Sequence, residues 1–260
     1  MAPLPSLTLA RHIVRNYEND DFSLIIIDGN LRVGKSTLAQ KALDQAHEYL
    51  GFRRLNKMRE LKWVMGWEPG EVVETWQLVK ERQPGFIWDD AGYWLHSMNW
   101  NDPLMISIQQ YFNVIGTDYN TIILTTPSPK WVLSKIASMP GMIRIRCTKR
   151  DGGKRDNKFR RFARTATAYK KWESPDMKRG GVNKKWIDQY SCEMDAELYA
   201  EYKPIRDMYA SKAKMSIVNN LARQRQKKEL EELREIRALK KLRKEIFGPD
   251  PLETQVNTND

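Results

Sequence analysis

The sequence is short of the features that mark secreted and membrane-spanning proteins. Only Cys147 and Cys192 of its 260 residues are cysteines, and they form neither a C-x-x-C pair nor part of a ligand cluster. No apolar stretch approaches the length of a membrane span, and Arg11 and Arg15 follow Leu9 too closely for a signal peptide. These absences exclude a secreted disulfide framework and predict a cytoplasmic protein without a transmembrane segment.

Positive charge is in excess, and one short segment carries nearly all of that excess. The net charge is +11, yet residues 1–148 hold 16 Lys and Arg against 15 Asp and Glu, and residues 186–260 hold 14 against 14. Residues 149–185 hold 14 against 4. A concentrated basic region is typical of contact with a polyanion, whereas an ordinary solvated surface mixes both signs. We therefore expect DNA to contact residues 149–185, the alternative being a basic loop that only aids solubility.

Strand-like and helix-like segments alternate along the first part of the chain. Short apolar runs predict buried strands, and longer stretches with apolar residues at helical spacing predict the helices between them. The expected strands are 23–28, 62–65, 86–88, 121–126 and 142–148, and the expected helices are 35–50, 70–82, 103–115 and 131–138. This alternation predicts an α/β fold with a mostly parallel sheet and helices on both faces, over residues 1–148.

The first expected strand and helix are joined by a glycine-containing loop. Its residues are Gly29, Asn30, Leu31, Arg32, Val33, Gly34, Lys35, Ser36 and Thr37, which match G-x-x-x-x-G-K-[ST] at every fixed position. The loop resembles the Walker A motif of P-loop NTPases. In that motif backbone N–H groups surround the phosphates, the lysine (here Lys35) reaches the β and γ oxygens, and the hydroxyl (here Ser36) coordinates Mg²⁺. The resemblance predicts a nucleotide site with ATP and Mg²⁺ as ligands.

A pair of acids follows the strand 86–88. Apolar residues that end in Asp89 and Asp90 resemble a Walker B strand, in which the first acid holds Mg²⁺. In the RecA-like and AAA+ ATPases the next acid polarises the attacking water, and Asp90 takes that position here. The family usually has Glu at this position, so the shorter Asp is a departure from the pattern. The alternative is that Asp90 only caps a turn.

Two threonines and two arginines complete the expected site. Thr125 and Thr126 end the strand 121–126, where a polar residue resembles the sensor that reads the γ-phosphate in the same ATPases. Thr is also common in strands, so these threonines could instead have only a structural role in the strand. Arg144 and Arg146 alternate along the strand 142–148 and face one side, so either could act as an arginine finger in a homo-oligomer or bind a nearby anion.

A GTPase interpretation competes with the ATPase one. Residues 89–92 also fit the D-x-x-G motif, and Thr148-Lys149-Arg150-Asp151 resembles the guanine-reading [NT]-K-x-D. Tyr93, however, stands where many small GTPases have a water-positioning Gln, and Thr148 replaces the usual Asn. The GTPase switch, bound to a protein partner, therefore stays the alternative, and a small-molecule kinase is a third class for which no acceptor site is evident.

The rest of the chain is expected to extend this core. Turn residues within 149–185 predict a β-hairpin with a charged tip, and residues 186–210 are expected to pack as helix on the core. Residues 211–247 are rich in Lys, Arg and Glu and predict one long helix. This helix could contact a neighbouring subunit, another protein or nucleic acid, or project into solvent, and residues 248–260 are expected to form a disordered tail.

The motifs together are similar to those of the small motor and assembly ATPases of plasmids, viruses and phages, including the zonula occludens toxin-like group. The resemblance covers residues 23–148. It implies an ATPase that acts on DNA in translocation, packaging, segregation or replication support. Fold alone does not separate these tasks.

Overall fold

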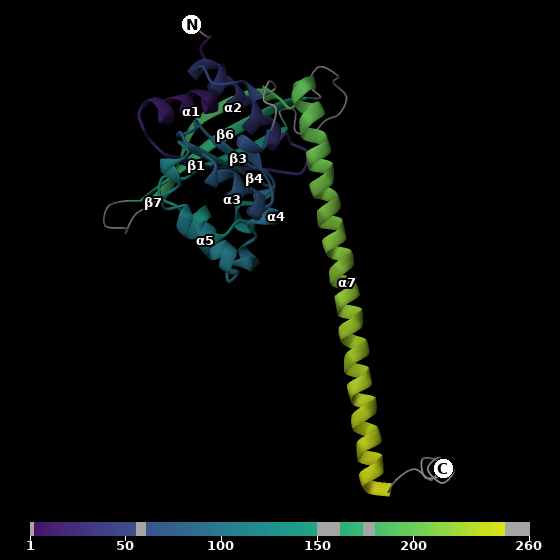
Figure 1. Ribbon diagram of the computed structural model, residues 1–260. Coiled ribbons are helices and arrows are strands. Elements are labelled where there is room, and N and C mark those ends of the chain that lie inside the picture. Colours follow the sequence, from purple (N-terminus) through teal and green to yellow (C-terminus); the bar gives the residue numbers. More distant parts are fainter. Residues whose placement is uncertain (1–2, 56–60, 150–161, 174–179, 248–260) are drawn as a thin grey trace. The chain divides into compact units, whose positions relative to one another are not determined.

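The computed structural model describes residues 3–55, 61–149, 162–173 and 180–247. These residues form an α/β fold with seven strands in one sheet and a long C-terminal helix (Figure 1). The chain divides into two compact units, residues 1–203 and 204–260. Within the described residues no helix combines the length and apolar character that a membrane span needs.

The strands follow the order β2-β3-β4-β1-β5-β6-β7 across the sheet. The first five are mutually parallel, and β6 and β7 extend the sheet as antiparallel strands beyond β5. The strand bounds are β1 (Ser23–Asp28), β2 (Met65–Gly66), β3 (Phe86–Trp88), β4 (Thr121–Thr126), β5 (Ile143–Lys149), β6 (Ala163–Glu173) and β7 (Gly180–Ser191). The mostly parallel sheet expected from the sequence is therefore confirmed.

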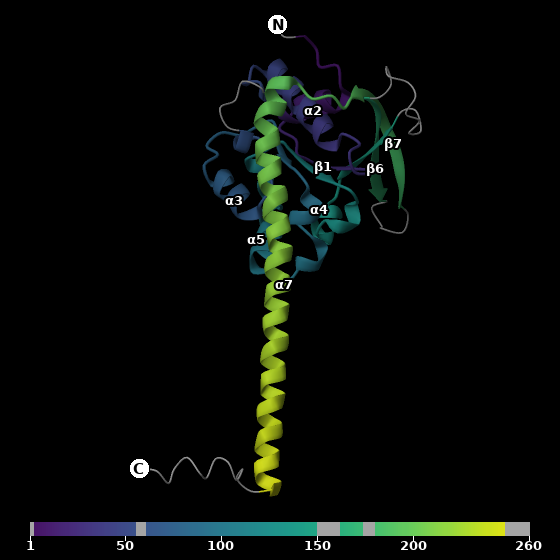
Figure 2. The same cartoon turned by 90° about the vertical axis from the view of Figure 1, so that its right-hand side faces the viewer.

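Helices cover both faces of this sheet (Figures 1 and 2). Alternate residues of β1, such as Leu24 and Ile26, pack with Val72 and Trp76 from one set of helices, whereas α2 contacts β1 and β4 and packs against α1. The helix bounds are α1 (Thr8–Glu18), α2 (Lys35–Leu50), α3 (Pro69–Gln77), α4 (Ala91–Trp94), α5 (Pro103–Tyr111), α6 (Ser134–Ala137) and α7 (Ala196–Phe247). A strand buried on both faces reads as a continuous apolar run, which is the pattern of β1.

The local predictions for the core hold with small shifts, and one prediction outside it is wrong. The strand expected at 62–65 lies at Met65–Gly66, and the helix expected at 70–82 ends at Gln77. Residues 186–191 belong to strand β7 and are not helical, because they pair with residues 163–168 of β6. Strands β5 and β6 on either side of the expected hairpin tip pair antiparallel, and the tip itself lies outside the described residues.

Helix α7 begins earlier than the sequence indicates, at Ala196, and continues across the unit boundary to Phe247. In the second unit the apolar side chains that the sequence places along the charged part of α7 are exposed; they include Leu230, Leu233, Ile236, Leu239 and Leu242. Lys227 and Lys241 each lie near a glutamate one turn later, at 3.9 and 4.0 Å. Such exposed pairs contribute little stability, so strong helix formers sustain this part of α7. The predicted tail 248–260 lies outside the described residues.

Candidate nucleotide site

The loop between β1 and α2 needs glycine at both of its fixed glycine positions. Gly29 has φ +145° and Gly34 has φ +87°, both in regions that side chains rarely adopt. A Cβ on Gly29 would lie 2.5 Å from the carbonyl oxygen of Cys147, and one on Gly34 would lie 2.5 Å from Cβ of Cys192. The loop therefore passes so close to the end of β5 and to the chain after β7 that neither position has room for a side chain.

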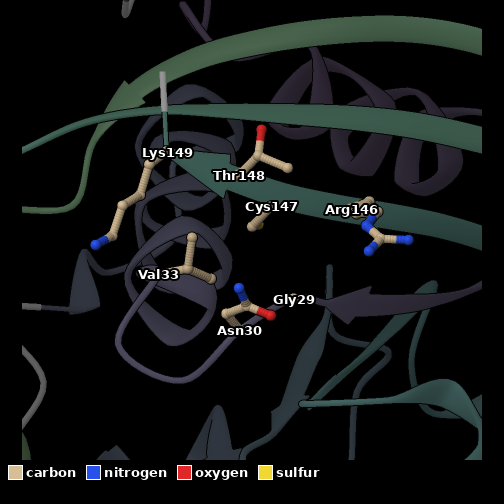
Figure 3. A pocket seen from close by; sticks show the side chains of 7 residues that line it. All are labelled: Gly29, Asn30, Val33, Arg146, Cys147, Thr148 and Lys149. Atoms are coloured by element: carbon tan, nitrogen blue, oxygen red, sulfur yellow. The ribbon is translucent and has the colours of Figure 1, made fainter. Parts of the chain in front are cut away.

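A cavity of about 340 Å³ lies beside this loop. Figure 3 shows loop residues Gly29, Asn30 and Val33 lining it opposite the end of β5. Asn30, Leu31 and Arg32 are exposed at the crest of the loop. The first part of the loop is thus accessible, and α2 begins directly after the loop at Lys35. Backbone N–H groups of such a loop and the N-terminus of the following helix can bind phosphate.

Lys35 is buried, and its ammonium group folds back over the loop. Its Nζ donates to the carbonyl oxygens of Gly29 and Asn30, each at 3.1 Å. These acceptors hold the cation at the loop, where it can exchange carbonyl oxygens for phosphate oxygens. A charged donor next to an anion site strengthens each hydrogen bond to the ligand.

A hydroxyl network joins the loop to the acid at the end of β3. Ser36 Oγ and Thr125 Oγ1 both donate to Asp89 Oδ1, each at 2.6 Å, and Asp89 is fully buried. Strand β4 lies between β1 and β3, so its carboxyl end reaches the space between the loop and the acid. The structure therefore brings together three residues that the sequence assigned to one site from three separate motifs.

The same network distinguishes the two threonines. Thr125 Oγ1 also accepts a hydrogen bond at 3.0 Å from the backbone N–H of Asp90. Thr126 Oγ1 donates to the carbonyl oxygen of Ser128 and accepts from its N–H, so this hydroxyl closes the turn after β4. Thr125 is thus the threonine that contacts both acids.

Asp90 has a left-handed backbone, with φ 49° and ψ 35°, directly before α4. Asp tolerates this conformation better than most residues, which gives one reason for Asp here. Its side chain is only partly buried, in contrast to that of Asp89. The turn presents Asp90 at the carboxyl edge of the sheet, next to the network.

Tyr202 is a site residue that sequence reasoning missed. Its hydroxyl donates to Asp89 Oδ2 at 2.8 Å, and its ring contacts that of Trp67 with centroids 6.0 Å apart. Tyr202 is 2% exposed and lies near the start of α7. Each oxygen of Asp89 therefore has a hydroxyl donor, and no sequence motif links these two distant positions.

The two candidate arginines have different surroundings. Arg144 donates from Nε and Nη2 to both oxygens of Asp28, each at 2.8 Å, and this hydrogen bonding raises the pKa of the guanidinium. Asp28 is buried at the end of β1, so Arg144 neutralises a carboxylate within its own chain. Arg146 is exposed and lines the cavity beside Gly29. The finger role of either residue stays a prediction.

No family model matches the chain. A viral protein, Uncharacterized protein B-251 of Sulfolobus spindle-shape virus 1, is 27% identical over 213 residues, which is 79% of this chain and 82% of that protein. The N-terminal domain of zonular occludens toxin from Neisseria meningitidis has 12% sequence identity and a TM-score of 0.35, and the match covers 69% of this chain and 98% of that one.

Strands β6 and β7 support the phosphate loop from the side. Arg164 Nε donates to the carbonyl oxygen of Val33 at 3.2 Å, and the Tyr190 hydroxyl donates to that of Gly34 at 3.1 Å. Both side chains are buried. Burial also raises the pKa of the Cys147 thiol, a neighbour of Tyr190, to about 11. Arg164 belongs to the basic segment, yet its buried side chain serves the loop and is not part of an exposed basic surface.

Proposed function

We propose that this protein is a Mg²⁺-dependent ATPase that acts on DNA. The observation that supports hydrolysis best is the network in which Ser36 of the phosphate loop and Thr125 of β4 share one oxygen of Asp89. A hydroxyl and a carboxylate at this position suit Mg²⁺, which prefers oxygen ligands and keeps water molecules of its own. When bound, the ion would neutralise charge on the phosphates.

Each residue has a separate task in this proposal. The loop N–H groups and Lys35 bind the β- and γ-phosphates, while Ser36 and Asp89 hold the metal. Thr125 orients Asp89 and, through the Asp90 N–H, the neighbouring turn. Asp90 orients the attacking water and accepts its proton. Catalysis of phosphoryl transfer rests on positioning and electrostatic stabilisation, and this set of groups supplies both.

Asp90→Asn tests the assigned base. The amide keeps the size and turn geometry of Asp90 but accepts a proton far less readily. We expect nucleotide affinity within about twofold of the wild type and turnover reduced about 100-fold, the lower end of the usual range for general base catalysis. Unchanged turnover would show that Asp90 only caps the turn.

The GTPase alternative also has one observation in its favour. Thr148 and Lys149, the first two residues of its guanine-reading motif, line the cavity beside Gly29 and Asn30. Arg150 and Asp151 of that motif lie outside the described residues. Displacement of a bound fluorescent nucleotide by ATP or by GTP shows which nucleobase the site prefers. Strong selectivity for GTP would contradict the ATPase proposal.

The other GTPase-like motif, D-x-x-G at residues 89–92, has a structural explanation for its glycine. A Cβ added to Gly92 would lie 2.2 Å from Thr126 Oγ1 and 3.3 Å from Cβ of Trp131. The glycine is therefore required by packing between α4 and the end of β4. This local reason makes a match to D-x-x-G weak support for a γ-phosphate switch, so we favour ATP.

Action on DNA is supported by the excess of ten positive charges in residues 149–185. In this proposal the β5–β6 hairpin contacts the phosphate backbone, α7 mediates contacts with neighbouring subunits or another protein, and hydrolysis drives DNA movement or assembly. The decisive assay is ATP hydrolysis with and without DNA at low salt, because such contacts weaken as salt rises. A protein that neither binds DNA nor responds to it would refute this part.

A further inference from the structure

A second cavity, of about 600 Å³, lies near the start of β5, at the sheet edge opposite the phosphate loop. Helix α1 forms one side of it, and strands β5, β6 and β7 form the other. We call it the basic cavity. Its lining residues are Thr8, Arg11, His12, Arg15, Ile143, Lys170, Lys185 and Trp186. The volume is within the range of about 300–1,000 Å³ that ligand pockets span.

The basic cavity holds four cations and no carboxylate among its lining residues. Arg11 and Arg15 are one helical turn apart and thus share a face of α1, while Lys170 and Lys185 come from β6 and β7. Within the described parts of the chain, none of the four has an ion pair. The nearby Asp188 carboxylate instead accepts from the N–H groups of Thr8 and Leu9, at 2.7 and 3.0 Å. Among the described residues, positive charge is therefore gathered here without an ion pair to balance it.

A β-bulge directs two consecutive residues into the basic cavity. Tyr169 pairs with Lys184 and Ala168 pairs with Trp186, so Lys185 is the extra residue of β7. Neighbouring side chains on a regular strand point to opposite faces, and a bulge breaks that alternation. This irregularity lets both Lys185 and Trp186 line one cavity. Bulges that re-aim side chains recur next to functional sites.

An aromatic pair forms the wall between the cations. The rings of His12 and Trp186 have centroids 5.5 Å apart, and His12 Nε2 is 3.0 Å from Ser23 Oγ. Burial, with Arg15 and Lys170 nearby, lowers the pKa of His12 to about 4. His12 is accordingly neutral at pH 7 and contributes a flat ring surface, while the surrounding arginines and lysines contribute the charge.

We propose that the basic cavity binds the phosphodiester backbone of nucleic acid. This inference rests on the proposed action on DNA and extends the contact surface from residues 149–185 to helix α1. A polymer fits better than a small anion, because Lys170 and Lys185 belong to the segment with the large charge excess, while Arg11 and Arg15 continue the cations along a helix face. Binding would be independent of sequence and sensitive to salt.

The test uses two double variants on the full chain, Arg11→Gln with Arg15→Gln, and Lys170→Gln with Lys185→Gln. Their matched control is Lys80→Gln with Lys135→Gln, which removes the same charge from exposed positions of the same unit, away from the basic cavity. Fluorescence anisotropy with single-stranded and duplex oligonucleotides over a salt series gives affinity and salt slope. ATP hydrolysis without DNA reports whether each variant is folded.

Removing two phosphate contacts should lower the salt slope by about 1.4 for single strands or about 1.8 for duplex. At about 0.15 M salt that corresponds to roughly 10- to 30-fold weaker binding. We expect this loss in both cavity variants, a smaller loss in the control, and unchanged hydrolysis without DNA in all three. Because the expected loss is larger for duplex than for single strands, the form of DNA that the cavity takes is the one whose measured loss reaches the value expected for that form.

Three results would overturn the proposal, and they differ in what else they refute. Cavity variants that bind DNA like the control refute the cavity contact and leave the proposed DNA-dependent ATPase intact. A wild-type protein that hydrolyses ATP but binds no oligonucleotide refutes the action on DNA as well. Variants that lose affinity for vesicles of anionic lipid, while oligonucleotide binding is unchanged, also contradict the proposal, because the cavity would then serve a membrane surface.

Discussion

Replacing Tyr202 by phenylalanine removes one hydroxyl from the Asp89 carboxylate and keeps the ring. The lost hydrogen bond is 2.8 Å long and ends on a fully buried charged group. Hydrogen bonds to charged groups contribute about 1.5–3 kcal/mol, and Asp89 Oδ2 would be left without this donor and without access to water. We expect Tyr202→Phe to lower the free energy of unfolding by about 2 kcal/mol, measured by urea denaturation without nucleotide.

The effect on the proposed metal site is separable from that on stability. Tyr202 is bonded to Oδ2, while Ser36 and Thr125 are bonded to Oδ1, so the tyrosine fixes the rotation of the carboxylate. Loss of such a supporting partner typically costs about 10–100-fold in metal affinity or activity. Titration of Mg²⁺ at saturating ATP should show a loss of that size, whereas nucleotide affinity in EDTA should be unchanged.

Tyr199→Phe is the matched control, because Tyr199 lies on the same helix with 46% of its surface exposed. It should leave both the stability and the Mg²⁺ dependence as they are. A Tyr202→Phe protein that is less stable but has wild-type Mg²⁺ dependence and turnover would refute the positioning role and leave only a packing role.

Two further predictions concern the charged groups around the sheet. Arg144→Gln should lower the free energy of unfolding by about 2 kcal/mol, because it leaves the buried Asp28 carboxylate without its ion-pair partner. Arg146→Gln, at an exposed position, should not lower it. An equal effect of the two substitutions would contradict the internal ion pair. The lowered pKa of His12 means that the unfolded state binds more protons between the folded value of about 4 and the unfolded value of 6.5. Stability is thus lost as pH falls through this window, by about 2 kcal/mol between about pH 7.5 and pH 5. His12→Gln should remove that part of the pH dependence in denaturation curves. An unaltered pH dependence would contradict the lowered pKa of His12.

The core and the position of the loop between β1 and α2 could be predicted because their signals are local. Strand β1 is a continuous apolar run, α2 follows a glycine turn, and β3 and β4 are short apolar segments that end in acids or threonines. Each signal lies within a few residues. Parallel strands end at a common edge, so the fold class together with the three motifs placed Ser36, Asp89 and the threonines that end β4 near one another.

The parts that could not be predicted depend on long-range contacts or on broken patterns. Tyr202 reaches Asp89 across 113 residues of sequence, and Arg164 reaches Val33 across 131. A tyrosine in an amphipathic stretch and an arginine in a basic segment carry no sign of such partners. Strand β7 was missed because the bulge at Lys185 interrupts the alternation that identifies a strand.

Strands β6 and β7 contribute residues to both proposed ligand sites, the nucleotide site and the basic cavity. Tyr190 of β7 bonds the loop at Gly34, and Lys185 and Trp186 of the same strand line the basic cavity. Lys41 of α2 further ties the helix that follows the loop to the end of β7, by a hydrogen bond of 2.9 Å to the Ser191 carbonyl oxygen. A shift of β7 that accompanies nucleic-acid binding would therefore move groups that hold the phosphate loop. Because coupling between two binding sites is reciprocal, a DNA that tightens nucleotide binding must itself bind more tightly when nucleotide is present, by the same factor.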